Sequence, residues 1–169
     1  MNNFFYELVI IDSGINEIIN EDGISFSFNN SGVIRCSDFF ADNVGHGTAI
    51  YSIIKSHNPN IKCFHIKIFD KETDSINEDV LLYALNYIYE NIECKFINMS
   101  LGIFIPMKRD DLYDVCNRLK EKGVILVSAF DNMEVISYPA AFDNVIGVAS
   151  DSDCTKITDV VFINNPIVN

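Results

Sequence analysis

Residues 8–15, LVIIDSGI, place four apolar residues of the kind found in strands directly before Asp12, Ser13 and Gly14. A strand that is apolar on both faces is typical of a parallel sheet covered by helices on either side. The carboxyl ends of such strands form the edge where ligands and catalytic groups gather. Asp12 is therefore a candidate functional residue. The alternative is an ordinary strand-to-turn junction, for which Asp before Ser-Gly is equally suited.

Further strand-like runs follow along the chain, separated by amphipathic segments of helix length. The predicted strands are residues 8–11, 62–69, 95–100, 124–129 and 144–150. This alternation indicates βαβ units, so we predict an α/β fold with helical layers around a mostly parallel central sheet. A further segment, ISFSFNNSGVIRC (24–36), alternates around an Asn-Ser-Gly turn and predicts a small hairpin beside the main sheet.

Three segments carry apolar residues at helical spacing. They are residues 48–56, 79–90 and 110–122. Ser75 and Glu78 stand at capping-box spacing before the second helix, and Gly123 is placed to end the third. No linker or internal repeat separates these elements. We therefore predict a single domain over residues 1–169.

The composition is that of a packed globular protein, with 49% hydrophobic and 21% charged residues among 169. Twelve Lys+Arg against 24 Asp+Glu give a formal net charge of −12, which argues against nucleic acid or a membrane as a partner. Five cysteines without a CxxC pair indicate neither a disulfide framework nor a zinc site. The N-terminus lacks the features of a secretory signal. We predict a cytoplasmic protein without a metal or other cofactor.

Three histidines are present, in different sequence settings. His46 lies between glycines in VGHGTAI, at the expected start of a helix, where its ring could be close to solvent and act as a base. The alternative is a solvent-exposed histidine at a helix cap. His57 is expected to cap the C-terminus of that helix, and His65, inside a predicted strand, is expected to be a hydrogen-bonded core or sheet-face residue.

Two later strands are followed by further candidate site residues. Asn132 follows the strand 124–129, so its amide could donate a hydrogen bond to the negative oxygen of a tetrahedral acyl-transfer intermediate. The alternative is a simple loop, since Asp-Asn is common in turns. Ser100, Leu101 and Gly102 end another strand, where glycine would let an extended peptide approach closely. Here too an ordinary strand end is the alternative.

Six segments in chain order resemble the signatures of the subtilisin-like serine protease family: VIIDSGI, GHGTAI, HIKIFD, INMSLG, GVILVSAFDN and YPAAFDNVIGVAS. The resemblance implies the subtilisin-like three-layer sandwich. It also implies that Asp12 orients the base, that His46 is the general base and that Asn132 is the oxyanion donor. Ser100, Leu101 and Gly102 match the segment that pairs with an extended substrate and lines its specificity pocket.

The sequence also departs from the family pattern. Family members continue into a Gly-Thr-Ser motif at the start of a long central helix, and that serine is the nucleophile. These 169 residues contain no Gly-Thr-Ser, and the usual Ala-Gly-Asn around the oxyanion residue is Phe130-Asp131-Asn132. We interpret the chain as an incomplete peptidase domain, truncated on its C-terminal side. Whether it is an enzyme stays open, because a histidine base needs a hydroxyl to deprotonate.

Three interpretations follow from the resemblance. The chain could supply Asp, His and the oxyanion Asn to a serine endopeptidase that a second polypeptide bearing the serine completes. It could be a pseudoprotease that binds an extended peptide or protein by strand addition without cleaving it. It could also be a decayed remnant without a present function. Because the central helix would cover one sheet face, its absence predicts an exposed apolar surface that favours a partner or self-association.

An unrelated α/β domain of the flavodoxin-like or receiver-like kind is a further alternative. Such a domain also shows an Asp at the end of its first strand. The sequence lacks the acidic cluster and the phosphate-cradling glycine loop that those domains use. The sequence therefore favours the subtilisin-like interpretation over this alternative.

Overall fold

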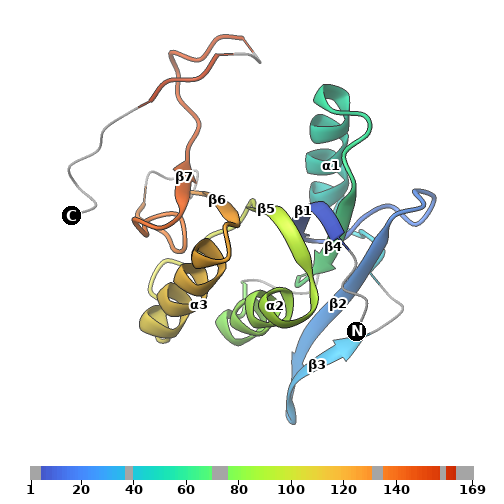
Figure 1. Cartoon of the computed structure of the whole chain (residues 1–169), viewed down its shortest axis with the longest axis vertical. Helices are drawn as coiled ribbons and strands as arrows, with labels where there is room; N and C mark the ends of the chain where they lie inside the picture. Colours follow the sequence, from blue (N-terminus) through green and yellow to red (C-terminus); the bar gives the residue numbers. More distant parts are fainter. Residues whose placement is uncertain (1–4, 37–39, 70–75, 131–134, 157–158, 163–169) are drawn as a thin grey trace.

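The computed structural model describes residues 5–36, 40–69, 76–130, 135–156 and 159–162 (Figure 1). Its elements, in order, are β1 (Phe5–Asp12), β2 (Asp22–Asn29), β3 (Gly32–Cys36), α1 (His46–His57), β4 (Cys63–Lys67), α2 (Glu78–Asn91), β5 (Glu93–Met99), α3 (Arg109–Glu121), β6 (Ile125–Ala129) and β7 (Ile146–Val148). Each element predicted from the sequence is present, with ends that differ by a few residues. The α/β fold class is confirmed.

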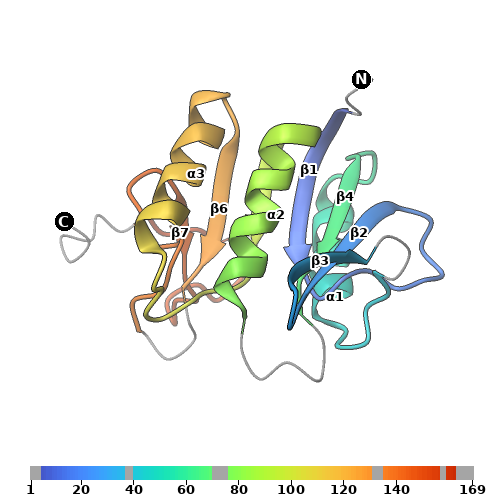
Figure 2. The ribbon, with the colours of Figure 1, turned by 90° about the horizontal axis from the view of Figure 1, so that it is seen from below.

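All strands in the described part of the chain belong to one sheet, in the order β3-β2-β4-β1-β5-β6-β7. Every neighbouring pair is parallel except β2 and β3. The hairpin predicted beside the sheet is instead its edge, because β2 also pairs with β4. Figure 2 shows α2 and α3 on one face of the sheet and α1 on the other, which gives three layers.

The larger hydrophobic core fills the space between the sheet and the α2–α3 layer. Its buried members include Val9, Ile11, Leu81, Leu85, Ile97, Met99, Leu112 and Leu119. A smaller cluster lies under α1, where Leu8, Ile10 and Cys63 meet Ile50, Tyr51, Ile54 and Ile61. This second cluster holds α1 over β1 and β4. No helix in the described part of the chain is both long and apolar enough to cross a membrane.

The start of α2 corrects the predicted capping box. The Asn77 side chain accepts hydrogen bonds from the backbone N–H groups of Asp79 and Val80, at 2.9 and 3.2 Å. The Glu78 carboxylate instead accepts from the backbone N–H groups of the loop before α3, at Met107 and Lys108. Ser75 lies outside the described residues. Asn77 is therefore the cap, and Glu78 links α2 to the segment that leads into α3.

The layer formed by α1 covers only part of its sheet face. Leu8, which lies under α1, pairs with Phe96, and Phe96 pairs with Ile125, so all three side chains lie on the same face. Beyond α1 this face is apolar and exposed. Its exposed members, called the half-face below, are Phe96, Ile125, Ile146 and Val148, with exposed fractions of 38, 43, 54 and 44%.

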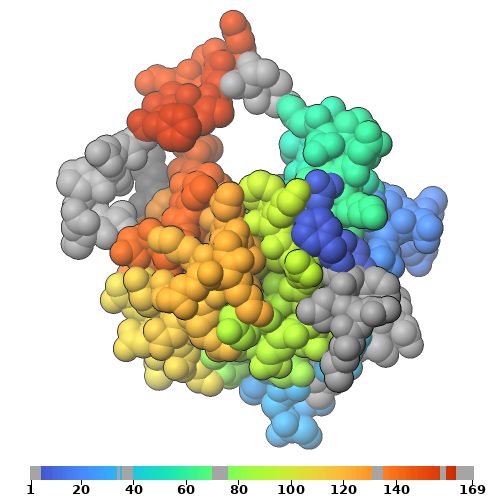
Figure 3. Space-filling model, in the orientation of Figure 1, coloured from blue at the N-terminus to red at the C-terminus, as the bar shows by residue number. Residues whose placement is uncertain are grey.

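Figure 3 shows an open hollow between α1, in turquoise, and the C-terminal segment, in red, next to β5 and β6. Within the described residues, no helix lies over the half-face. Parallel sheets are normally covered by helices on both faces. The sheet therefore carries the exposed apolar surface that the sequence predicts.

Candidate active site

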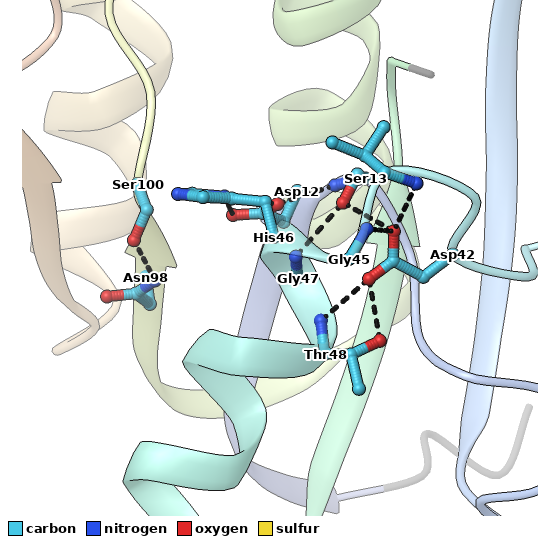
Figure 4. Close-up of polar contacts among 10 residues, drawn as sticks. Asp12, Ser13, Asp42, Gly45, His46, Gly47, Thr48, Asn98 and Ser100 are labelled. Carbon is cyan, nitrogen blue, oxygen red and sulfur yellow. Dashed lines mark hydrogen bonds and ion pairs between the residues drawn. The ribbon is translucent and has the colours of Figure 1, made fainter. Parts of the chain in front are cut away.

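Asp12 and His46 meet at the carboxyl edge of the sheet. Asp12 ends β1 and His46 begins α1, and the imidazole Nδ1 lies 2.8 Å from Oδ1 and 3.0 Å from Oδ2 of the carboxylate (Figure 4). Asp12 is 1% exposed, whereas the His46 side chain is 47% exposed. A buried carboxylate thus holds one ring nitrogen of a half-exposed imidazole. No group of the described chain bonds the other nitrogen, Nε2.

The protonation of this pair follows from its surroundings. Burial raises the pKa of the Asp12 carboxyl, against the lowering effect of hydrogen bonds from His46 and from the Ser13 backbone N–H at 2.7 Å. These donors each favour the ionised form, and they oppose the rise in pKa without cancelling it. A carboxylate at Nδ1 selects the tautomer with its proton on that atom. Nε2 then has a free lone pair and can take a proton as a general base.

The glycines of VGHGTAI account for the approach of α1 to β1. A Cβ added to Gly47 would lie 2.2 Å from the backbone oxygen of Gly14 and 3.3 Å from Cβ of Asp12. Only glycine permits that approach. Gly45 has φ of 96°, in the left-handed region that favours glycine, and leads the chain into α1. The glycine on each side of His46 is therefore a geometric requirement of the pair.

Asp42, which was not among the predicted site residues, holds the start of α1. Its carboxylate accepts hydrogen bonds from the hydroxyls of Ser13 and Thr48 and from backbone N–H groups at the helix start (Figure 4). Burial opposes its ionisation, but bonds from Thr48, Gly45 and Ser13 outweigh burial and lower the pKa of Asp42 to about 2. An Asp shortly before a helix is a recognised cap signal. That signal was available in the sequence, four residues before His46.

The three predicted substrate-binding residues follow β5 at the same edge. Figure 4 shows the His46 ring extending from α1 towards the side of the site where Ser100 lies. The Ser100 hydroxyl accepts a hydrogen bond from Asn98 Nδ2 at 3.0 Å, and both Ser100 and Gly102 are half-buried. The Leu101 side chain is buried in the core, and its carbonyl accepts from Ser128 Oγ at 3.1 Å. Leu101 therefore supports this segment from inside.

Asn132 lies outside the described residues, so its role as an oxyanion donor stays a prediction. The strand before it, β6, does end at the edge that carries Asp12, since Ser128 pairs with Met99 and Met99 with Ile11. Among the residues that the structure describes, no group of three or more His, Cys, Asp or Glu side chains is arranged to hold a metal ion.

No protein-family model matches the chain. Two curated proteins of Bacillus subtilis (strain 168) are similar in sequence. The minor extracellular protease Epr is 31% identical over 163 residues, which cover 89% of this chain and 24% of Epr. The major intracellular serine protease is 27% identical over 146 residues, which cover 77% of this chain and 45% of that protein. The chain thus spans less than half the length of either relative.

The fold is also similar to solved protease structures. The psychrophilic subtilisin-like protease Apa1 from the Antarctic bacterium Pseudoalteromonas sp. AS-11 superposes with a TM-score of 0.59 at 22% identity. The match covers 84% of this chain and 35% of Apa1. At this level of identity the likeness concerns the fold. Together with the two sequence relatives, it agrees with the six segments that carry the sequence resemblance.

Proposed function

Because the chain belongs to the subtilisin-like serine protease family, we propose that it supplies the aspartate and histidine of a serine endopeptidase site. The observation that carries the proposal is the bond between buried Asp12 and half-exposed His46, which leaves Nε2 ready to accept a proton. The 169 residues contain no Gly-Thr-Ser motif. In this proposal the nucleophilic serine therefore comes from a polypeptide segment outside them, and the chain is inactive until that segment is present.

The proposed chemistry is acyl transfer. The serine hydroxyl attacks the scissile carbonyl while His46 Nε2 takes its proton, and the C=O π electrons move to the carbonyl oxygen. Asp12 stabilises the imidazolium that forms. His46 then gives this proton to the leaving amine as the C–N bond breaks. Asn132 is proposed to donate a hydrogen bond to the negative oxygen of the intermediate.

The proposed substrate is an extended peptide or protein segment. Ser100 and Gly102 follow β5 at the edge that carries His46, where an extended peptide could add as a further strand. The buried side chain of Leu101 fixes the backbone between them. A peptide laid along this segment would bring a backbone carbonyl close to the base.

The half-face supports completion of the site by a further segment. Phe96, Ile125, Ile146 and Val148 expose apolar side chains over strands that end beside the site. An apolar helix on this surface would remove it from water and could carry a hydroxyl to His46 Nε2. A second copy of the chain is the other occupant that such a surface could take.

We also propose that the protein works in the cytoplasm. The described cysteines Cys63, Cys94, Cys116 and Cys154 are all free thiols. Burial raises the pKa of Cys116 to about 12, which keeps that thiol protonated and inert. One relative is an intracellular protease and the other an extracellular one. Cell fractionation tests this placement, and a secreted protein with paired cysteines would contradict it.

Labelling with a serine-directed fluorophosphonate probe tests the proposed function. The purified chain alone should not be labelled, because it offers the base but no activated serine. A mixture with a serine-bearing polypeptide encoded beside it should be labelled on that polypeptide. His46→Ala should abolish labelling, since the base is lost, whereas His57→Ala, at the far end of the same helix, should not.

Two outcomes would contradict the proposal. Labelling of the mixture that survives His46→Ala would show that another base acts. No labelling in either sample, together with saturable binding of an extended peptide, would instead identify a pseudoprotease.

A further inference from the structure

The Asp42 carboxylate collects hydrogen bonds on both of its oxygens. Oδ1 accepts from Ser13 Oγ at 2.9 Å and from the backbone N–H groups of Val44 and Gly45 at 3.0 and 2.7 Å. Oδ2 accepts from the backbone N–H and the hydroxyl of Thr48 at 2.9 and 2.6 Å. One carboxylate therefore fixes both the loop before α1 and the first turn of the helix.

Ser13 joins this carboxylate to the end of β1. Its hydroxyl donates to Asp42 and accepts from the backbone N–H of Gly47 at 3.0 Å. Its own backbone N–H donates to Asp12 Oδ1 at 2.7 Å. Ser13 is fully buried. Ser13 thus bonds both Asp12 and Gly47, the residue that follows His46. It therefore helps to position both members of the catalytic pair.

Backbone bonds set the position of Asp42 itself. Its N–H donates to the carbonyl of Ile15 at 2.9 Å, and the Ile15 N–H donates to the carbonyl of Phe40 at 3.1 Å. Lys67, at the end of β4, donates from Nζ to the Ala41 carbonyl at 2.9 Å. The segment before α1 is therefore anchored to the chain after β1 and to the neighbouring strand.

We propose that Asp42 is a positioning residue for His46: through Ser13 and the first turn of α1 it holds the imidazole with Nδ1 on Asp12 and Nε2 directed outward. The proposal rests on the proposed function for its importance to catalysis, but the geometry belongs to this chain alone. Without the carboxylate, the first turn of α1 and the Ser13 hydroxyl lose their common acceptor. The ring can then leave Asp12, and the proton is no longer confined to Nδ1.

Asp42→Asn is the sharpest substitution, because it keeps the shape of the side chain and removes its charge. An amide has one acceptor oxygen and one NH₂ group that only donates. In either orientation the NH₂ would face donors, namely those of Thr48 or those of Ser13, Val44 and Gly45. The variant therefore breaks the support of the helix start without removing bulk.

The tautomer of His46, measured by ¹⁵N and ¹H NMR of the imidazole at about pH 8, tests the proposal. In the wild-type chain the proton should reside on Nδ1 and give a downfield resonance. Asp42→Asn should lower the ratio of Nδ1–H to Nε2–H tautomer by about tenfold, the effect of losing a charge-assisted hydrogen bond. Ser13→Ala should change the ratio in the same direction by less.

Asn77→Ala is the matched control, because it removes the side-chain cap of α2, which packs on the opposite sheet face. It should weaken a helix start without changing the His46 tautomer. A wild-type ratio in Asp42→Asn and Ser13→Ala, or an equal change in Asn77→Ala, would overturn the proposal. If Asp42→Asn does not fold by circular dichroism, Ser13→Ala decides alone. If the tautomer ratio changes as expected but the probe labels neither sample, the proposed function is rejected and the role of Asp42 as a positioning residue stands.

Discussion

At the scale of single residues, two histidines show how surroundings decide chemistry. His46 exposes half of its side chain and binds a carboxylate. His65, on β4, is 1% exposed, and neither of its ring nitrogens has a hydrogen-bond partner among the described residues. The expected core position of His65 is confirmed, but the expected hydrogen bond is not found among the described residues. Burial lowers the pKa of His65 to about 4, so the ring stays neutral beside Tyr51 at a centroid distance of 5.3 Å.

Because His65 is buried, we predict that the fold loses stability in mild acid, at a pH above the range in which ordinary carboxyl groups titrate. Between the ordinary histidine pKa of 6.5 and the folded pKa of about 4, the unfolded chain binds a proton that the folded chain does not. Stability should therefore fall as the pH drops from about 6.5 to 4, by about 2 to 3 kcal/mol. Urea denaturation across this range measures the effect.

His65→Leu, of similar volume, should flatten this pH dependence, whereas His57→Gln on the exposed end of α1 should not. The groups that face the His65 ring oppose one another, since Glu21 and Asp42 raise its pKa and Lys55 lowers it. An unchanged slope in His65→Leu would assign the acid sensitivity to other groups.

The residues of the site differed in how well the sequence could predict them. Asp12 and His46 lie in VIIDSGI and GHGTAI, two segments that resemble family signatures, so the sequence singles out both although they are 34 positions apart. The cap signal of Asp42 is present in the sequence, but no local pattern indicates its bond to Ser13, which is 29 positions away. The same limit explains the false capping box, since Glu78 bonds backbone N–H groups that lie 29 and 30 positions further along the chain.

At the scale of elements, the position of α1 depends more on hydrogen bonds at its start than on packing along its length. Gly47 is its only fully buried residue, and its apolar side chains are half-buried on the small cluster over β1 and β4. The hydrogen bonds around Asp42 therefore do more to position α1 than the helix cap does to position α2, because α2 buries five residues. The position of the helix that carries His46 is thus set by hydrogen bonds at the sheet edge.

The half-face is an element-scale surface with a measurable consequence. Ile125→Asn and Ile146→Asn should change the free energy of unfolding by less than about 0.5 kcal/mol, because both side chains are exposed in the chain alone. Each should weaken binding of the proposed serine-bearing segment about tenfold, the value of burying one such side chain. Titration by fluorescence anisotropy measures the dissociation constant.

Ile18→Asn serves as the control, because Ile18 is also exposed but lies in the loop between β1 and β2. It should leave the dissociation constant unchanged. If all three variants weaken binding equally, the cause is a general effect of the added polar side chain. If neither half-face variant weakens binding, the proposed segment binds elsewhere.

At the scale of the whole molecule, the alternation of strands and helices was enough to predict the α/β class and the parallel sheet. The order of the strands was not predictable, because β1 lies between β4 and β5, whose pairing partners are far away in sequence. The hairpin of β2 and β3 joined the sheet edge for the same reason. Local patterns predict elements, whereas the order in a sheet depends on long-range contacts.

The central claim is that Asp12 and His46 form a working base for a serine supplied from outside these residues. The rate of fluorophosphonate labelling of the assembled protein, wild type against Asp12→Asn, tests it most directly. An Asn at this position favours the wrong histidine tautomer, and the rate should fall about 10⁴-fold, the effect of this change in a Ser-His-Asp triad, while binding of the proposed serine-bearing segment is unchanged. Equal labelling rates would show that Asp12 does not orient the base, and the account would be wrong.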